Sequence, residues 1–198
     1  MLRITGGTLR GRRIATPKGR MTRPTAEKVR EGIFNTLGSL VDLEGAVVLD
    51  LYAGSGALGI EALSRGAGQV VFLEAHARTA AAIRANLKSL GVPPSQWRVI
   101  TARVESWLGK PQIPEGVLVI LADPPYASGE AERALEALAR ATAVPSGTNI
   151  VLEAAARSAP ELPAGLEILR VKRYGDTQVV YLAKTEIPAL HSVEGTPS

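Results

Sequence analysis

The most specific chemical signal in the sequence is the run Asp123-Pro124-Pro125-Tyr126, which follows an apolar stretch. Its two prolines fix the backbone angle φ and lack N–H donors, so the run presents mainly hydrogen-bond acceptors. The Asp123 carboxylate and the Pro124 carbonyl match an exocyclic amino group with two N–H donors, such as N2 of guanine or N6 of adenine. Tyr126 could stack on such a base, which must be unpaired or flipped out to reach the loop. We take these four residues as candidate catalytic residues. The alternative is a proline-rich turn with Tyr126 in the core.

A glycine-rich loop is the second signal, in the segment Asp50-Leu51-Tyr52-Ala53-Gly54-Ser55-Gly56-Ala57-Leu58-Gly59. Gly54 and Gly56 allow a tight turn and the close approach of a ligand to the backbone. The segment also fits the dinucleotide pattern G-x-G-x-x-G, which alone is weak. However, the Asp50 carboxylate would repel a pyrophosphate and suits a cationic ligand, or it holds the loop in place.

Glu74 lies 24 residues after Asp50, at the end of the next expected strand. A carboxylate at that place can accept hydrogen bonds from both hydroxyls of a ribose. The alternative is a solvated charge at a strand end.

The elements that must position these residues alternate in type. Apolar runs predict strands, and segments with helical periodicity follow most of them, which favours an α/β fold with a mostly parallel seven-stranded sheet and helices on both faces. Gly175-Asp176 predicts the turn of a C-terminal antiparallel hairpin. Ligands of such sheets lie beyond the carboxyl ends of the strands. The expected strands are residues 46–52, 70–74, 98–101, 118–122, 150–153, 166–174 and 177–183, and the expected helices are residues 25–40, 58–65, 78–90 and 130–141.

Charge is unevenly distributed along the chain. Nine of the 23 Lys and Arg residues lie within residues 1–30 beside a single acid, Glu27, whereas the rest of the chain has more acids than bases. We interpret residues 1–24 as a basic β-hairpin extension that turns at Gly6-Gly7 and attracts a polyanion, the alternative being a solvated tail. Residues 25–184 are expected to form one domain, and residues 185–198 a disordered tail.

Composition excludes several classes of site. The chain has no cysteine, so disulfides, thiolate nucleophiles and cysteine-based metal centres are absent. His76 and His191 are too isolated to suggest a metal site, and we expect none. No apolar run approaches the length of a membrane span, and no secretory signal is evident. We expect a cytoplasmic protein with no membrane association.

The motifs together resemble a known family. The segment D-x-Y-A-G-S-G resembles the first motif of the class I methyltransferases, which have a Rossmann-like fold and bind S-adenosylmethionine. The chain further resembles the RsmD-type methyltransferases, which make N2-methylguanine in small-subunit (16S) ribosomal RNA. The marks of this resemblance, over residues 1–184, are Arg3-Ile4-Thr5-Gly6-Gly7, Arg10-Gly11-Arg12-Arg13, Arg23-Pro24-Thr25, Val29-Arg30-Glu31, Phe34-Asn35, the two loops above and Lys172-Arg173-Tyr174-Gly175-Asp176-Thr177.

The resemblance implies a bacterial cytoplasmic enzyme that acts on ribosomal RNA within a partly assembled small subunit. We expect the protein to be a monomer. In this class an Asp often follows the third strand to receive the adenine amino group, but this sequence has Ala102 and Arg103 there. The implied cofactor contacts are Asp50, Tyr52, Ala53, Gly54, Ser55, Gly56, Glu74, Ala75, Ala102 and Arg103. The implied RNA contacts are Arg10, Arg12, Arg13, Lys18, Arg20, Arg23 and Thr25.

Three alternatives remain from the sequence. A DNA adenine-N6 methyltransferase would use the same Asp-Pro-Pro-Tyr loop, although no target-recognition insertion is visible. An RNA-binding assembly factor could retain a vestigial site. An NAD-dependent oxidoreductase would bind nicotinamide, but no second mononucleotide half is evident.

Overall fold

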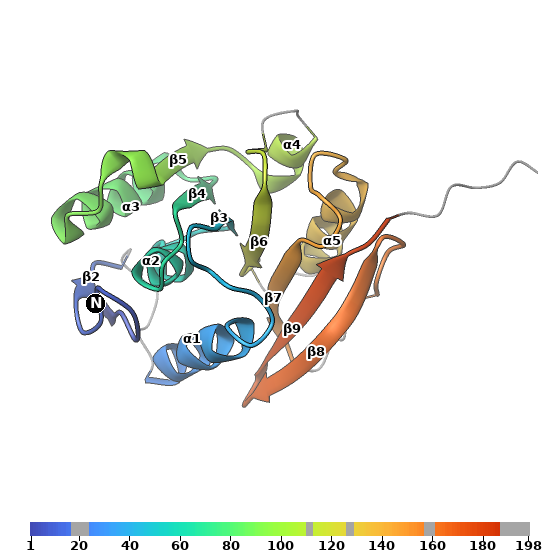
Figure 1. The fold of residues 1–198 in the computed structure, drawn as a ribbon, viewed down its shortest axis with the longest axis horizontal. Helices are drawn as coiled ribbons and strands as arrows, with labels where there is room; N and C mark the ends of the chain where they lie inside the picture. The colour runs from blue at the N-terminus through green and yellow to red at the C-terminus, as the bar shows by residue number, and fades with distance from the viewer. Residues whose placement is uncertain (17–23, 110–112, 126–128, 157–160, 187–198) are drawn as a thin grey trace, which may run out of the picture.

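A seven-stranded sheet forms the centre of the protein in the computed structural model, which describes residues 1–16, 24–109, 113–125, 129–156 and 161–186. Its strands are β3 (Val47–Leu51), β4 (Gln69–Glu74), β5 (Trp97–Thr101), β6 (Val117–Ala122), β7 (Asn149–Ala155), β8 (Leu166–Tyr174) and β9 (Thr177–Lys184). Their spatial order is β5-β4-β3-β6-β7-β9-β8 (Figure 1). The first five pair in parallel, whereas β9 lies antiparallel to both β7 and β8. The predicted mixed sheet and its terminal hairpin are therefore confirmed.

Helices cover both faces of this sheet, as Figure 1 shows. They are α1 (Pro24–Leu37), α2 (Ala57–Ser64), α3 (Ala77–Leu90), α4 (Val104–Leu108) and α5 (Glu130–Arg140), and a 3-10 turn, η1 (Pro94–Gln96), precedes β5. Ile33 of α1, Ile60 of α2 and Leu87 of α3 belong to one buried cluster. Trp107 of α4 and Leu138 of α5 belong to a second cluster on the opposite face.

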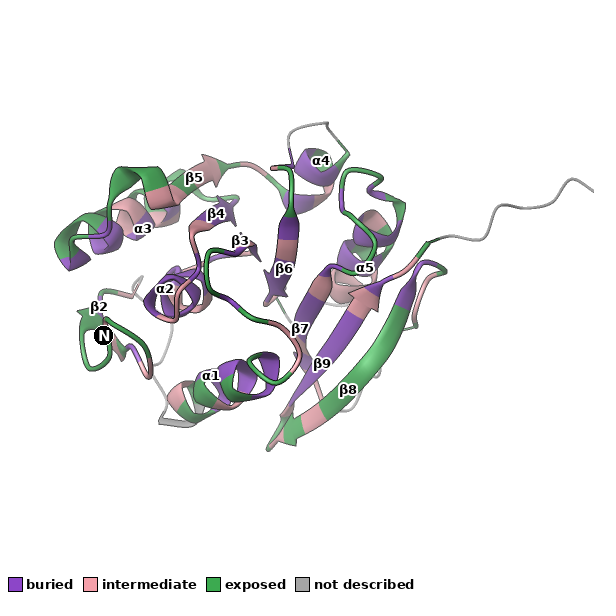
Figure 2. Ribbon diagram, in the orientation of Figure 1, coloured by how far each residue is buried: buried purple, intermediate pink, exposed green. Residues whose placement is uncertain are grey.

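The inner strands contribute side chains to both clusters. Along β4, Phe72 packs in the α1–α3 cluster and its neighbour Leu73 packs in the α4–α5 cluster. Figure 2 shows these strands buried along most of their length. Because both faces are covered, nearly every position is apolar, which explains the continuous apolar runs in the sequence.

The strand order changes direction at β3 and β6, which are neighbours in the sheet. From β3 the chain continues to β4 and β5 on one side, and then it returns to β6 and β7 on the other. Residues Leu51 and Ala122 are register partners at the carboxyl ends of β3 and β6. Such a switch point leaves a crevice beyond the strand ends, and open α/β sheets bind their ligands there.

The N-terminal hairpin is present, but its expected turn is wrong. Strands β1 (Leu2–Arg3) and β2 (Arg13–Ile14) pair antiparallel, and residues 4–12 connect them. Gly7 has a φ of 72°, and an added Cβ would lie 1.6 Å from the carbonyl oxygen of Ser64. The glycine pair therefore lies where the connection packs closely against the end of α2. It does not form the tip of the hairpin, where the sequence predicts it.

Two further boundaries differ from the expectations. Helix α4 was not expected, since its five residues are too few to show a period. Helix α1 ends at Leu37, so Leu40 lies in the following turn rather than on the helical face. Of the expected tail, residues 187–198 lie outside the described residues.

Candidate active site

The Asp-Pro-Pro loop and the glycine-rich loop meet at the crevice between β3 and β6. Asp50 lies within β3, and Asp123 follows the last residue of β6, which pairs with Leu51. Asp50 and Asp123 line the same cavity, of about 550 Å³. The two loops that the sequence singled out therefore form one site. Tyr126 lies outside the described residues.

The glycine-rich loop turns as its composition predicts. Gly54 and Gly56 have φ values of 56° and 77°, which favour glycine, and the N–H of Gly56 donates to the Ala53 carbonyl at 2.7 Å. A Cβ on Gly59 would lie 2.3 Å from the ring of Phe72. Gly59 thus allows α2 to pack closely on β4, which brings the start of the helix to the crevice.

The Asp50 carboxylate is buried and holds this loop. Its Oδ2 accepts the N–H of Gly59 at 2.9 Å, so the loop-holding interpretation is correct. Burial raises the pKa of Asp50 to about 7; the Gly59 hydrogen bond opposes this effect, and the charges of Asp123 and Glu74 add to it. A cationic ligand in the crevice would favour the ionised carboxylate.

Glu74 closes the glycine-rich loop from the neighbouring strand. Its Oε2 accepts the N–H of Gly54 at 2.9 Å, and its Oε1 accepts the N–H of His76 at 2.8 Å. The side chain is not a solvated strand-end charge, because Glu74 is only 7% exposed. It lines a second cavity, of about 420 Å³, together with Gly54, Ala75, Ala102 and Arg103.

Nine of the ten expected cofactor residues line one or both of the two cavities. We name the two cavities after the ligands expected from the sequence, the 420 Å³ cavity as the cofactor cavity and the 550 Å³ cavity as the base cavity. Gly56 lines neither, since it starts α2. Gly54, Glu74, Ala75, Ala102 and Arg103 line the cofactor cavity, Asp50, Ala53 and Ser55 line the base cavity, and Tyr52 lines both.

Tyr52 stands where the two cavities adjoin. It has a φ of 59°, which an L-residue rarely adopts, and such strain often accompanies a functional site. Its hydroxyl donates to Oε1 of Glu105 at 3.0 Å. Burial, followed by the charge of Glu105, raises the pKa of Tyr52 above its ordinary value, so the hydroxyl stays protonated at neutral pH. Sequence reasoning missed Glu105 because it lies on the unexpected helix α4.

The base cavity has walls from distant parts of the chain. Asp123, Pro124 and Pro125 contribute one wall. The hairpin of β8 and β9 contributes residues 174–177, and α1 contributes Val29 and Arg30. Sequence analysis gave these hairpin residues only as marks of the family resemblance, without a place in the site. Asp123 and Pro125 also line the cofactor cavity, so the two cavities share residues.

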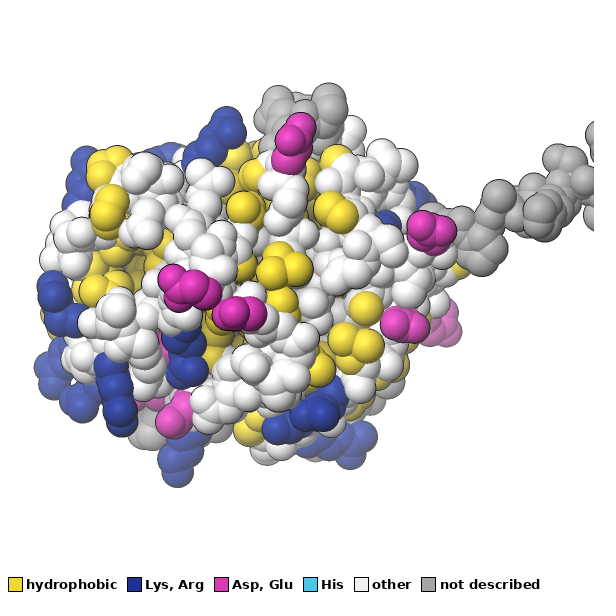
Figure 3. Space-filling model, viewed as in Figure 1, with side chains coloured by type: hydrophobic (Ala, Val, Ile, Leu, Met, Phe, Trp, Pro, Cys, Tyr) yellow, Lys and Arg dark blue, Asp and Glu magenta, His cyan; other side chains and the backbone are white. Residues whose placement is uncertain are grey.

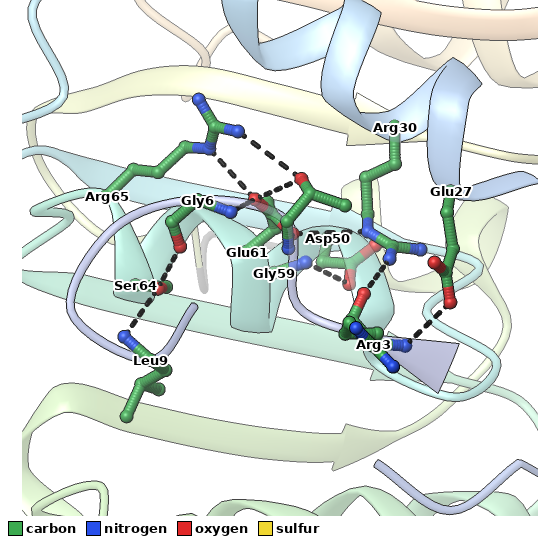
Figure 4. A network of polar contacts seen from close by, with 11 residues as sticks. Arg3, Gly6, Leu9, Glu27, Arg30, Asp50, Gly59, Glu61, Ser64 and Arg65 are labelled. Atoms are coloured by element: carbon green, nitrogen blue, oxygen red, sulfur yellow. Dashed lines mark hydrogen bonds and ion pairs between the residues drawn. The ribbon is translucent and has the colours of Figure 1, made fainter. Parts of the chain in front are cut away.

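The N-terminal hairpin is fixed to the site by Glu61, which is completely buried (Figure 4). The Glu61 carboxylate accepts hydrogen bonds from the backbone N–H groups of Thr5 and Gly6 at 2.9 and 2.8 Å. It also pairs with Nε of Arg30 at 3.2 Å and with Nε of Arg65 at 2.9 Å. Burial opposes ionisation, but the hydrogen bonds from Thr5 and Arg65 and the charge of Arg30 hold the pKa of Glu61 below its ordinary value.

A second contact joins the segment after β2 to the glycine-rich loop. Asn86 of α3 accepts the N–H of Ala15 and donates to the Ala15 carbonyl, both at 2.9 Å. The same amide nitrogen lies 3.3 Å from the carbonyl oxygen of Ser55. The basic extension is therefore packed against α2 and α3 beside the glycine-rich loop, and over its described residues it is not a loose tail.

The basic residues of this extension face solvent where they are described. Arg10, Arg12 and Arg13 are exposed, and Arg12 donates to the carbonyl of Ser89 at 3.3 Å. Figure 3 shows Lys and Arg side chains gathered on the side of the molecule that carries the N-terminal hairpin. Lys18, Arg20 and Arg23 lie outside the described residues, and Thr25 is in α1.

A model of a known protein family matches almost the whole chain. A family model described as "Conserved hypothetical protein 95" matches residues 2–183. The chain belongs to this family. Ribosomal RNA small subunit methyltransferase D of Escherichia coli K12 is 33% identical over 181 residues, which are 91% of this chain and 87% of that protein. A shorter match to YlbH of Bacillus subtilis, proposed to be an rRNA methyltransferase, is 44% identical over 89 residues, 45% of this chain and 47% of that protein.

A solved structure agrees with this family assignment. That of yhhF from Escherichia coli, proposed to be a methyltransferase, has a TM-score of 0.80 and 28% identity, and covers 93% of this chain and 98% of that one. The expected Rossmann-like class I methyltransferase fold and the resemblance to the RsmD-type family are confirmed.

Membrane-spanning helices and clustered metal ligands are both missing from the described part of this family member. None of its helices there is long and apolar enough to cross a membrane. No group of three or more His, Asp or Glu side chains within the same residues is arranged to hold a metal ion.

Proposed function

We propose that the protein transfers a methyl group from S-adenosylmethionine to the exocyclic N2 amino group of a guanine in small-subunit ribosomal RNA. The observation that carries the proposal is that Asp123 and Pro125 line both cavities. A loop of hydrogen-bond acceptors thus adjoins a space for a cofactor and a space for a base. The family and the name of its Escherichia coli relative support the ribosomal substrate.

The residues of the cofactor cavity fit the proposed methyl donor. Glu74 can accept the ribose hydroxyls while it keeps its bonds to the backbone, because a carboxylate has about four acceptor sites. Ala102 and Arg103 would border adenine, with the backbone as hydrogen-bond partner. The acidic side chains that line this cavity, among them Glu74, Glu105 and Asp123, favour the ammonium and sulfonium charges of the donor. When bound, S-adenosylmethionine supplies an activated methyl group, so the protein has to bind, orient and exclude water.

The acceptor loop is suited to orient an aromatic amine. The nitrogen is a poor nucleophile because its lone pair is delocalised into the ring. The Asp123 carboxylate and the Pro124 carbonyl can accept its two hydrogens and direct the lone pair toward the cofactor cavity. Holding reactants in line can supply up to about 7–11 kcal/mol of barrier reduction in the best intramolecular cases. Asp123 can also take the proton that the methylated nitrogen releases.

The basic extension would hold the RNA that carries this base. Arg10, Arg12 and Arg13 are exposed on a hairpin whose residue Leu2 lines the base cavity. Contacts from such arginines to phosphates position a nucleic acid without reading its sequence. We propose that they bind ribosomal RNA in a partly assembled small subunit, and that the protein acts as a cytoplasmic monomer without a metal.

The test is transfer of a labelled methyl group to small ribosomal particles from cells that lack the protein. The wild-type protein should produce N2-methylguanosine, identified by mass spectrometry of the nucleosides. Asp123→Asn should reduce the rate by about two orders of magnitude, which is typical for the loss of a positioned proton acceptor. Asp42→Asn, in the loop between α1 and β3 and outside the lining of both cavities, is the matched control and should leave the rate unchanged.

Other outcomes would replace the proposal. Methylation of DNA adenine at N6 would identify the protein as a DNA methyltransferase. Binding of RNA without transfer to any substrate would identify an assembly factor. Binding of NAD without S-adenosylhomocysteine would identify an oxidoreductase.

A further inference from the structure

Glu153 lies beside Asp123 at the carboxyl edge of the sheet. Ala122 and Leu152 are register partners of the parallel strands β6 and β7, and Asp123 and Glu153 are the next residues of each segment. Both side chains line the base cavity. The sequence alone assigns Glu153 no role, because its position next to Asp123 depends on the pairing of β6 with β7.

The two carboxyl groups also share a face of the sheet. Leu121 and Val151 both pack in the cluster under α1, and side chains two residues further along a strand point to the same side. Asp50 continues this arrangement on β3, where Val48 packs in the same cluster. The ends of three neighbouring strands thus place three carboxyl groups along one wall of the base cavity.

Arg30 is the one cationic residue among the described residues that line the base cavity. It is only 5% exposed, and its guanidinium bonds Glu61 and the carbonyl of Arg3. Ionised carboxylates accept hydrogen bonds and do not donate them. The wall therefore suits a ligand edge that presents several N–H donors side by side.

The edges of the purine bases differ in this respect. Guanine presents the N1–H donor next to its N2 amino group, so adjacent positions both donate. Adenine presents its N6 amino group next to N1, which carries a lone pair and accepts. An ionised carboxylate opposite N1 would attract guanine and repel adenine.

We propose that Glu153 accepts the N1–H of the target guanine while Asp123 and the Pro124 carbonyl accept its N2 hydrogens. Glu153 is then a specificity-determining residue that selects guanine from adenine. This inference rests on the proposed function, since it assigns the ring position next to the amino group that is methylated. Any bond that Glu153 makes within the protein can persist, because the carboxylate has further acceptor sites.

The test uses 2-aminopurine in place of the target guanine in small-subunit RNA assembled into particles. This base retains the 2-amino group, but its N1 is an acceptor. The wild-type protein should methylate guanine at least about a hundredfold more efficiently in kcat/KM, because a site built around a donor strongly rejects an analogue that lacks it. In Glu153→Gln the amide can donate to N1 of 2-aminopurine. The ratio of kcat/KM for guanine to that for 2-aminopurine should therefore fall by about tenfold or more.

The matched control is Glu136→Gln, an exposed Glu on α5, which should keep the wild-type preference. Cofactor affinity and melting temperature, measured for each variant, separate a change of specificity from a loss of folding. If Glu153 had only a structural role, Glu153→Gln would lower the activity toward guanine and 2-aminopurine equally.

The outcomes separate the inference from the proposed function. If the wild-type protein methylates no guanine, the proposed function fails. If it methylates guanine and 2-aminopurine equally well, the role of Glu153 is overturned without any variant. An unchanged preference in a folded Glu153→Gln protein overturns it as well.

Discussion

The carboxylate of Glu74, at the end of β4, accepts the N–H of Gly54 at 2.9 Å in the loop that follows β3. This bond ties two neighbouring strand ends together across the cofactor cavity. A residue expected from the sequence to bind ribose thus shapes the glycine-rich loop.

Glu74→Gln should weaken the binding of S-adenosylhomocysteine by roughly ten- to a hundredfold, since a hydrogen bond to a charged group contributes about 1.5–3 kcal/mol. The Gln amide has one acceptor oxygen and no charge. It therefore cannot replace the carboxylate as the acceptor for both the loop N–H and the two ribose hydroxyls. Titration calorimetry measures the change. Glu136→Gln serves as the exposed control, and an equal loss of affinity in both variants would contradict the assignment.

Asp50→Asn should stabilise the protein increasingly as the pH rises from about 4 to 7. The pKa of Asp50 is raised from its ordinary value of 3.8 to about 7 in the folded protein, so in this range the folded state binds a proton that the unfolded state lacks. Wild-type stability therefore falls with rising pH across the window. The gain of the Asn variant is bounded by about 4 kcal/mol, at about 1.4 kcal/mol for each pKa unit.

Denaturant unfolding of both proteins at several pH values measures this gain. The Asn side chain can still accept the N–H of Gly59, so the loop should keep its shape. A constant difference between the two proteins from about pH 4 to 8 would show that Asp50 is not titrating in this range.

Glu61→Ala should destabilise the protein by about 3–5 kcal/mol, because it leaves the buried guanidinium of Arg30 without its partner. The N-terminal hairpin should also become accessible to proteases, since Thr5 and Gly6 lose their acceptor. Glu136→Ala is the control, because its ion pair with Arg140 is exposed and such pairs contribute little.

The contribution of Glu61 should depend on pH in the opposite sense to that of Asp50. Its pKa in the folded protein lies below the ordinary value of 4.5, so its stabilisation is complete above that value and is lost as the pH falls through the folded-state pKa. The difference between wild type and Glu61→Ala should shrink in acid. A difference that stays constant down to the acid transition would refute this account.

Replacement of Arg10, Arg12 and Arg13 by Gln should weaken RNA binding and reduce its dependence on salt. For each phosphate that the protein no longer binds, the slope of log K against log salt should fall by about 0.7 for single-stranded RNA. Fluorescence anisotropy over a salt series measures this slope. The control replaces Arg133 and Arg140 of α5, and a slope unchanged by the N-terminal replacements would exclude this hairpin as the RNA contact.

The sequence alone determined the parts of the site that depend on local order. Asp50, Glu74 and Asp123 were found because apolar runs identify buried strands and polar residues at their ends must lie at one edge of a parallel sheet. The turn at Gly54 and Gly56 was found because few other residues tolerate a positive φ. Local composition therefore predicted the fold class and the two loops.

Only the tertiary structure brought distant segments together. Glu153 lies next to Asp123 because β6 pairs with β7, Glu105 bonds Tyr52 from α4, and Glu61 bonds both Thr5 and Arg30, which come from different elements. None of these contacts has a period or spacing in the sequence. They follow from strand order and from the burial of charges that require partners, and the packing of the whole chain decides both.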